Sequence, residues 1–307
     1  MGSPLAHEAE LVPAWPGRPI EVAGTRVYVR HAPATSPSAE CGLFLHGLGG
    51  GSSNWTDLMD MLRDRLECYA PDLPGFGQSS PPPDGAYDVH AQARATVKLI
   101  EAGGYAPVHL FGNSLGGTVA IHVAAQRPGL VRTLTLVSPA LPDLRPSLTS
   151  ALMLVPLVPG IGRALMKRAA GMTVDELARQ NLEAIYGDPA RIHPQRLQET
   201  AEEIRAMVDL PHVQGAYVGA LRGLVGAYLQ RGRSRMWRQA TRVEAPTLLV
   251  YGAADRFVSP RMASRALHAF SRCRVVMLSG VGHVAQMETP EIVAETVRPL
   301  LSDPVAF

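Results

Sequence analysis

A serine flanked by glycines is the most chemically informative feature of this sequence. Residues 112–117 read GNSLGG, with Ser114 third in the run, and they follow the apolar stretch 108–111 (VHLF). A helix-forming stretch begins directly afterwards. A G-x-S-x-G pentad between a strand and a helix places its serine at a sharp turn, where the hydroxyl is exposed as a nucleophile. Glycines are expected on both sides because such a turn leaves little room for a Cβ atom.

A candidate acid and a candidate base follow later in the chain. Asp255 and His283 each come shortly after an apolar run that predicts a buried strand. In the order serine, acid, histidine, His283 would accept the proton of Ser114 and later return it to the leaving group. Asp255 would fix the imidazole tautomer and stabilise the imidazolium. Asp143, which follows an earlier predicted strand, is a second candidate for the acid.

Together these residues resemble the α/β-hydrolase superfamily, from about residue 20 onward. A strand that runs into a glycine-rich loop at 43–50 (LFLHGLGG) and the segment 72–79 (DLPGFGQS) add to the resemblance. It implies an α/β-hydrolase fold: a mostly parallel eight-stranded sheet with helices on both faces and an inserted helical cap. It also implies an oxyanion hole built by the backbone N–H groups of Leu48 and Leu115, each worth about 3–4 kcal/mol of the barrier. His46 is then expected to hold the loop without transferring a proton.

Alternation of predicted strands and helices supports this fold and divides the chain. Strands and helices alternate through residues 20–138 and again through 242–307, which predicts a parallel sheet that binds ligands at the carboxyl ends of its strands. Between them, residues 139–241 contain no convincing strand and are interpreted as the cap. Its predicted helices are 174–186, 194–208 and 213–230.

Composition narrows the class of protein. The chain has 307 residues, of which 46% are hydrophobic and 18% charged, and its net charge is +2. That length suffices for one large α/β domain with an insertion, and the near-neutral charge gives no support for nucleic-acid binding. The three cysteines form no spaced pairs, which fits a reducing compartment. No signal-peptide pattern or apolar run long enough to span a bilayer is found, so a cytoplasmic protein without a transmembrane segment is expected.

No cofactor or metal is expected. His90, His193 and His212 have no carboxylates or cysteines beside them at the spacing of metal ligands. The expected partner is a small-molecule ester, and the sequence leaves the oligomeric state open.

Several features bear on the substrate. A serine in the elbow argues against haloalkane dehalogenases and epoxide hydrolases, whose ester intermediate forms on a carboxylate. The runs GNSLGG, 53–55 (SNW) and 282–286 (GHVAQ) are similar to meta-cleavage-product hydrolases, which cut carbon–carbon bonds. Their cap arginine, which holds a substrate carboxylate, would correspond here to Arg222. However, residues 152–166 are rich in Leu, Met, Val and Pro, which favours an aliphatic acyl chain lined by Leu154 and Leu157.

The sequence therefore predicts a serine hydrolase that cleaves carboxylic esters, similar to esterases and lipases. A carbon–carbon hydrolase is the main alternative. A proline-type aminopeptidase stays open because Glu199, Glu202 and Glu203 form an acidic group in the cap, and a non-catalytic ligand-binding protein is the remaining alternative. Three further polar residues are candidates for contact with substrate: Asn54, Asn113 and Gln286.

Overall fold

The computed structural model describes residues 11–143, 148–158, 160, 171–232, 235–305 and 307. At its centre is an eight-stranded sheet with the strand order β1-β2-β4-β3-β5-β6-β7-β8. The strands are β1 (Gly17–Val22), β2 (Thr25–Ala32), β3 (Glu40–Leu45), β4 (Leu66–Pro71), β5 (Val108–Asn113), β6 (Val131–Val137), β7 (Thr247–Gly252) and β8 (Cys273–Leu278). Strand β2 is antiparallel to both β1 and β4, and every other pairing is parallel. The predicted fold class is confirmed.

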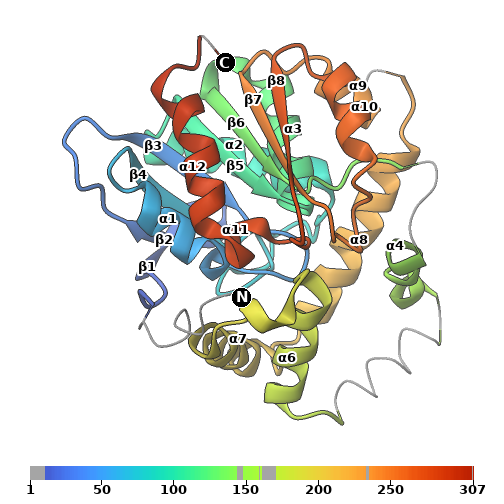
Figure 1. The fold of residues 1–307 in the computed structure, drawn as a ribbon. Helices are drawn as coiled ribbons and strands as arrows, with labels where there is room; N and C mark the ends of the chain where they lie inside the picture. The colour runs from blue at the N-terminus through green and yellow to red at the C-terminus, as the bar shows by residue number, and fades with distance from the viewer. Residues whose placement is uncertain (1–10, 144–147, 159, 161–170, 233–234, 306) are drawn as a thin grey trace.

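Helices cover both faces of the sheet (Figure 1). One face carries α2 (Val89–Gly103), α3 (Leu115–Gln126), α9 (Met236–Ala240) and α10 (Met262–Ala269). The other carries the short η2 (Ser52–Trp55) with α1 (Thr56–Leu62), α11 (Ala285–Glu288) and α12 (Pro290–Ser302). Every residue of β5 and β7 is buried, because parallel strands at the centre of such a sheet are covered on both faces.

The register brings the ends of the central strands to one edge of the sheet. Leu45 at the end of β3 pairs with Gly112 of β5, and Asn113 at the end of β5 pairs with Val137 of β6. Farther along, Gly252 at the end of β7 pairs with the last residue of β8. The loops that follow β3, β5, β7 and β8 therefore leave the sheet at the same edge, where the fold class binds ligands.

Between β6 and β7 the described residues contain helices and no strand. These are α4 (Leu148–Leu152), η4 (Val155–Leu157), α6 (Val174–Ile185), η5 (Pro189–Arg191), α7 (Pro194–Met207), α8 (Val213–Leu229) and α9. The helices α6, α7 and α8 begin where the sequence predicts and end one residue earlier. In Figure 1, α6 and α7 lie side by side beyond the edge of the sheet. Helix α9, although it falls within residues 139–241, packs on α3 and α10 beside the sheet.

Local signals explain where these helices begin and end. The side chain of Asp88 accepts the N–H groups of residues 90 and 91 and so caps α2. The helix is followed by Gly104, which lies in the left-handed region at φ 64°. Thr173 and Glu176 form a capping box at the start of α6, and Pro194 is the first residue of α7.

Close packing fixes α8 against the start of α2. A Cβ atom at Gly223 would lie 2.4 Å from the Cα atom of Asp88, and one at Gly219 would lie 2.8 Å from the ring of Tyr87. Around a Cβ at Gly215, no described atom lies within 4 Å other than those of its chain neighbours and its own helix backbone. Gly219 and Gly223 therefore allow the backbone of α8 to approach the residues before α2, as ridges-into-grooves packing requires.

Candidate active site

Ser114 occupies a strained turn between β5 and α3. Its backbone has φ 51° and ψ −115°. Residues other than glycine rarely adopt such a conformation, and it costs about 1–3 kcal/mol. The flanking glycines are required by close contacts. A Cβ atom at Gly116 would lie 2.3 Å from the carbonyl oxygen of Leu45, and one at Gly112 would lie 2.5 Å from the carbonyl oxygen of Gly116. The packing of α3 against β3 and β5 thus fixes the serine.

His283 and Asp255 form a hydrogen-bonded pair. The Nδ1 atom of His283 lies 2.9 Å from Oδ2 of Asp255. The other carboxylate oxygen accepts the N–H groups of Phe257 and Val258, at 2.8 and 2.9 Å. Burial by itself raises the pKa of Asp255, but the charge and hydrogen bond of His283 and the backbone donors outweigh it, so the pKa is lowered. An ionised carboxylate that accepts from Nδ1–H leaves Nε2 of the imidazole as the proton acceptor.

The loop that carries His283 is tied to two other elements. Asn113, next to the serine, donates from Nδ2 to the carbonyl oxygens of Val137 and His283, at 3.1 Å each. The N–H of His283 donates to the carbonyl of Ile185 at the end of α6, at 2.7 Å. The side chain of Asn113 therefore connects the elbow, β6 and the histidine loop, which makes it a structural residue whatever it contacts in a substrate.

A buried carboxylate also joins the histidine loop to α6. The side chain of Glu288 is fully buried and accepts the N–H groups of Gly282, Gly187 and Asp188 at 2.7–3.0 Å. Arg191 adds an ion pair at 3.3 Å. Sequence reasoning missed Glu288, because a single acidic residue before the Thr-Pro start of a helix gives no signal that it is buried.

His46 has a structural role. Its Nε2 accepts the N–H of Leu73 at 2.9 Å, so Nδ1 must carry the proton, and this atom lies 2.8 Å from the carbonyl oxygen of Gly47. Complete burial lowers the pKa of His46 and keeps the ring neutral. The histidine thus holds the glycine-rich loop against the loop after β4.

The two predicted oxyanion donors border the serine. Leu115 is the first residue of α3, and Leu48 lies in the glycine-rich loop that contacts the elbow at Gly47. Within the described parts of the chain, neither N–H donates to another protein group. At the first position of a helix, the N–H of Leu115 has no intrahelical acceptor, which leaves it open to a negatively charged oxygen.

A pocket of about 320 Å³ lies beside Ser114, and Leu115 is buried and does not line it. Ser114 and His283 line it together with Leu48, Asn54 and Asn113. Its apolar wall consists of Met153, Leu182, Ile185, Ile204, Met207, Tyr217, Phe257 and Val284. The ring of Phe257 packs on that of His283, with centroids 5.3 Å apart. Most of the apolar wall comes from the helices between β6 and β7, while the elbow and histidine come from the sheet.

Comparison with known proteins identifies the family. A family model described as the alpha/beta hydrolase fold matches residues 43–290. The chain belongs to the α/β-hydrolase family. Its relatives perform different reactions, so their names do not decide the reaction of this α/β hydrolase.

Two curated relatives and one solved structure illustrate that range. The dihydrolipoyllysine-residue acetyltransferase component of the acetoin cleaving system from Cupriavidus necator is 29% identical over 256 residues, which cover 81% of this chain and 60% of the relative's own length. Lipase 1 from Psychrobacter immobilis is 27% identical over 259 residues, which cover 83% of this chain and 75% of the lipase. The crystal structure of a membrane phospholipase A has a TM-score of 0.75 at 25% identity, with coverage of 94% and 86%.

Three residues predicted to bind substrate lie away from the pocket of this α/β hydrolase. Leu154 is exposed and Leu157 half-buried, and neither lines the pocket, whereas their neighbour Met153 does. Arg222 is exposed on α8 and is also absent from the pocket lining. Met153 and Leu154 are adjacent in one turn, where successive side chains point in different directions. The prediction of Leu154 therefore misses the pocket residue by one position. Residues 159 and 161–166 of the predicted apolar stretch lie outside the described residues.

Other candidates also lie away from the pocket. Gln286 is buried within the core, 1% exposed, and does not line the pocket. Asp143 pairs with Arg261 at 3.4 Å, so Asp255 and not Asp143 contacts the histidine. Of the acidic group on α7, only Glu203 reaches the pocket, since Glu199 pairs with Arg196 and Glu202 is exposed beside Gln198.

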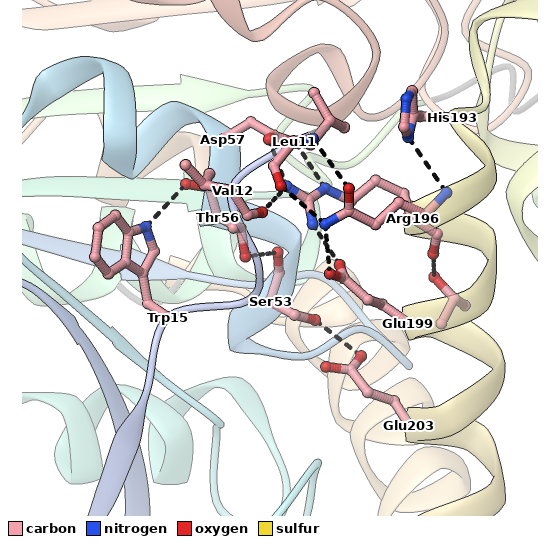
Figure 2. A network of polar contacts seen from close by, with 12 residues as sticks. Leu11, Val12, Trp15, Ser53, Thr56, Asp57, His193, Arg196, Glu199 and Glu203 are labelled. Atoms are coloured by element: carbon pink, nitrogen blue, oxygen red, sulfur yellow. Dashed lines mark hydrogen bonds and ion pairs between the residues drawn. The ribbon is translucent and has the colours of Figure 1, made fainter. Parts of the chain in front are cut away.

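Helix α7 is fastened to the sheet domain by a polar network (Figure 2). The guanidinium of Arg196 binds both carboxylate oxygens of Asp57 on α1, at 3.0 and 2.6 Å, and donates to the carbonyl of Val12 at 2.7 Å. Gln195 exchanges two hydrogen bonds of 3.0 Å with the backbone of Leu11. The network anchors the first turn of α7, the helix whose later residues Ile204 and Met207 line the pocket.

Within the described ranges, no group of three or more His, Cys, Asp and Glu side chains could hold a metal ion. None of the helices in this part of the chain is long and apolar enough to cross a membrane.

Proposed function

We propose that this protein is a serine hydrolase that cleaves carboxylic esters with an aliphatic acyl group, through an acyl-enzyme on Ser114. The observation that carries the proposal is the elbow at Ser114, with its strained φ, in the same pocket as a histidine paired with a buried aspartate. Serine is a weak nucleophile unless a base is at hand, and this arrangement supplies the base and its orienting acid.

The steps follow from the groups in the pocket. Nε2 of His283 accepts the hydroxyl proton as Ser114 attacks the ester carbonyl, and Asp255 stabilises the imidazolium that forms. The N–H groups of Leu48 and Leu115 hold the oxyanion, aided by the positive end of α3. The imidazolium then protonates the leaving alcohol. Water then attacks the carbonyl of the acyl-enzyme, with His283 again as the base. The carboxylic acid leaves, and His283 returns the proton to Ser114.

The substrate class is proposed from the walls of the pocket. Residues 139–241 serve as a cap in this proposal, and α6, α7 and α8 supply most of the apolar wall. An acyl chain buried there gains about 0.8 kcal/mol for each methylene group. Lipase-like relatives support a lipid-type ester, although at low identity. The three free cysteines support a reducing compartment, the cytoplasm, as the location.

Three alternatives lose support. A carbon–carbon hydrolase of the meta-cleavage type needs a cation for the substrate carboxylate, and Arg222 is exposed outside the pocket. A proline-type aminopeptidase needs an acidic group for the free amine, and only one glutamate of the predicted three lines the pocket. A protein that only binds ligands would not require the strained elbow.

The test is a turnover panel on the purified protein. We expect p-nitrophenyl esters of medium chain length to be hydrolysed with a higher kcat/KM than the acetate, because the apolar wall contacts the longer chain. A dienol carbon–carbon substrate and a prolyl amide are measured beside them. Faster turnover of either of these than of every ester would reject the ester assignment in favour of the corresponding alternative.

A further inference from the structure

One side of the pocket differs chemically from the apolar wall. We define it as the polar wall: Gly50, Gly51, Asn54, Thr200 and Glu203. It is built where the glycine-rich loop and the start of η2, which follows it, meet α7, since Ser53 of η2 donates its hydroxyl to Oε2 of Glu203 at 2.8 Å. The same loop contacts Ser114 at its other end, because a Cβ atom at Gly47 would lie 3.3 Å from the Cβ of the serine. One short loop therefore runs from the nucleophile to the polar wall.

Glu203 has acceptor capacity that the protein leaves unused. A carboxylate can accept about four hydrogen bonds. Ser53 provides one, and Arg30 lies 3.4 Å from the other oxygen. About a third of the side chain (32%) remains accessible, and the residue lines the pocket. Burial raises the pKa of Glu203 against the opposing effects of Ser53 and Arg30, so these partners do not replace the lost hydration fully.

The polar wall also offers donors and neutral acceptors. Oδ1 of Asn54 accepts the N–H of Gly51 at 3.1 Å, which leaves its NH₂ group as the donor on this wall. The hydroxyl of Thr200 donates to the carbonyl of Arg196 at 2.7 Å, so its oxygen is available as an acceptor. A group that both donates and accepts is complementary to this set, and a hydroxyl does both.

We infer that the polar wall binds a hydroxyl-bearing alcohol portion of the substrate, so that the preferred substrates are monoesters of a glycerol-like polyol. This inference rests on the proposed function and names the leaving group of the same reaction. The apolar wall takes the acyl chain, which leaves the polar wall for the alcohol on the other side of the ester bond. A hydroxyl fits better than an ammonium group because Arg30 already pairs with the glutamate.

The experiment compares two esters of one fatty acid, 1-monooctanoylglycerol and methyl octanoate. We expect wild-type protein to hydrolyse the glycerol ester with the higher kcat/KM, which requires no variant. Glu203→Gln should lower kcat/KM for the glycerol ester by about 10-fold or more, the size of a lost hydrogen bond to a charged group, and leave methyl octanoate within about twofold. The matched control is Glu202→Gln on the exposed side of the same helix, which should change neither.

Each other outcome rejects the inference. Equal losses on both esters would mean that Glu203 only supports the glycine-rich loop through Ser53. No loss on either would mean that the alcohol does not reach the polar wall. A wild-type preference for the choline ester of octanoic acid over the glycerol ester would assign the wall to a cation. Absence of Ser114-dependent turnover for all three esters would instead reject the proposed function itself, and is recognised because methyl octanoate fails as well.

Discussion

A Cβ atom at position 116 would lie within 2.5 Å of the carbonyl oxygens of both Leu45 and His46, which are backbone atoms that cannot rotate away. We therefore expect Gly116→Ala to displace the elbow. Overpacking of this kind costs about 1–3 kcal/mol of unfolding free energy, and misplacing a nucleophile by about 1 Å can cost about 100-fold in turnover. Urea denaturation and ester turnover measure the two effects.

Gly226→Ala is the matched control for Gly116→Ala. Apart from its chain neighbours and the backbone of its own helix, no described atom lies within 4 Å of a Cβ at this exposed position on α8, so the substitution should stabilise the helix by up to about 1 kcal/mol and leave turnover unchanged. If the two alanine variants behave alike, the contacts at position 116 do not fix the serine.

Glu288 connects the loop that carries His283 to the residues after α6. Glu288→Ala would leave three backbone N–H groups and Arg191 without their acceptor. Because an unpaired buried donor costs about 1–3 kcal/mol and the hydrogen bond from Gly282 is buried, we expect about 1–3 kcal/mol of lost stability in urea denaturation, with lower kcat because His283 moves. Glu295→Ala, exposed on α12, should stay within about 0.5 kcal/mol. A Glu288 variant as stable as this control would contradict the account.

The network around Arg196 predicts a similar contrast within one helix. Arg196→Ala breaks a nearly buried ion pair with Asp57, so we expect a loss of about 3–5 kcal/mol and faster amide exchange in α7. The control is Arg205→Ala on the same helix. Its ion pair with Asp175 is exposed and 3.5 Å long, and such pairs contribute less than about 1 kcal/mol. Equal effects of the two variants would mean that the network does not anchor α7.

How far the sequence predicts this protein depends on how local each signal is. The elbow, the strands before Asp255 and His283, and the helices α6, α7 and α8 were predicted because turn chemistry and periodicity act over a few residues. The residues of the pocket wall are not predicted, because Leu154 lies in the turn between α4 and η4 and Arg222 on α8, and packing against distant elements decides which side chains of these segments face the pocket. Glu203 was seen as one of three acidic residues, but only the meeting of α7 with the glycine-rich loop distinguishes it.

For the whole molecule, stability should fall in mild acid because of His122. His122 lies on α3, and its buried ring contacts Met236 of α9 and the ring of His90. Burial and, to a smaller extent, the charge of His90 lower its pKa to about 4. The unfolded chain, with an ordinary histidine pKa near 6.5, binds the proton first, so stability is full above about pH 6.5 and declines towards about pH 4. Over that window we expect wild type to lose about 3 kcal/mol more unfolding free energy than His122→Leu.

The control for this pH dependence is His268→Leu, which removes an exposed imidazole on α10. Its decline between about pH 6.5 and pH 4 should follow that of wild type. Should His122→Leu lose as much stability as wild type across the window, the acid sensitivity would originate in another group.

Covalent labelling tests most directly whether Ser114 is the nucleophile. A fluorophosphonate should add one adduct to the intact wild-type protein, located at Ser114 by peptide mass spectrometry, and none to Ser114→Ala. The variant should keep the wild-type unfolding free energy within about 0.5 kcal/mol while ester turnover falls by about 10⁶, the size seen when a triad serine is removed. Labelling at another residue, or wild-type turnover by a folded Ser114→Ala protein, would contradict the account.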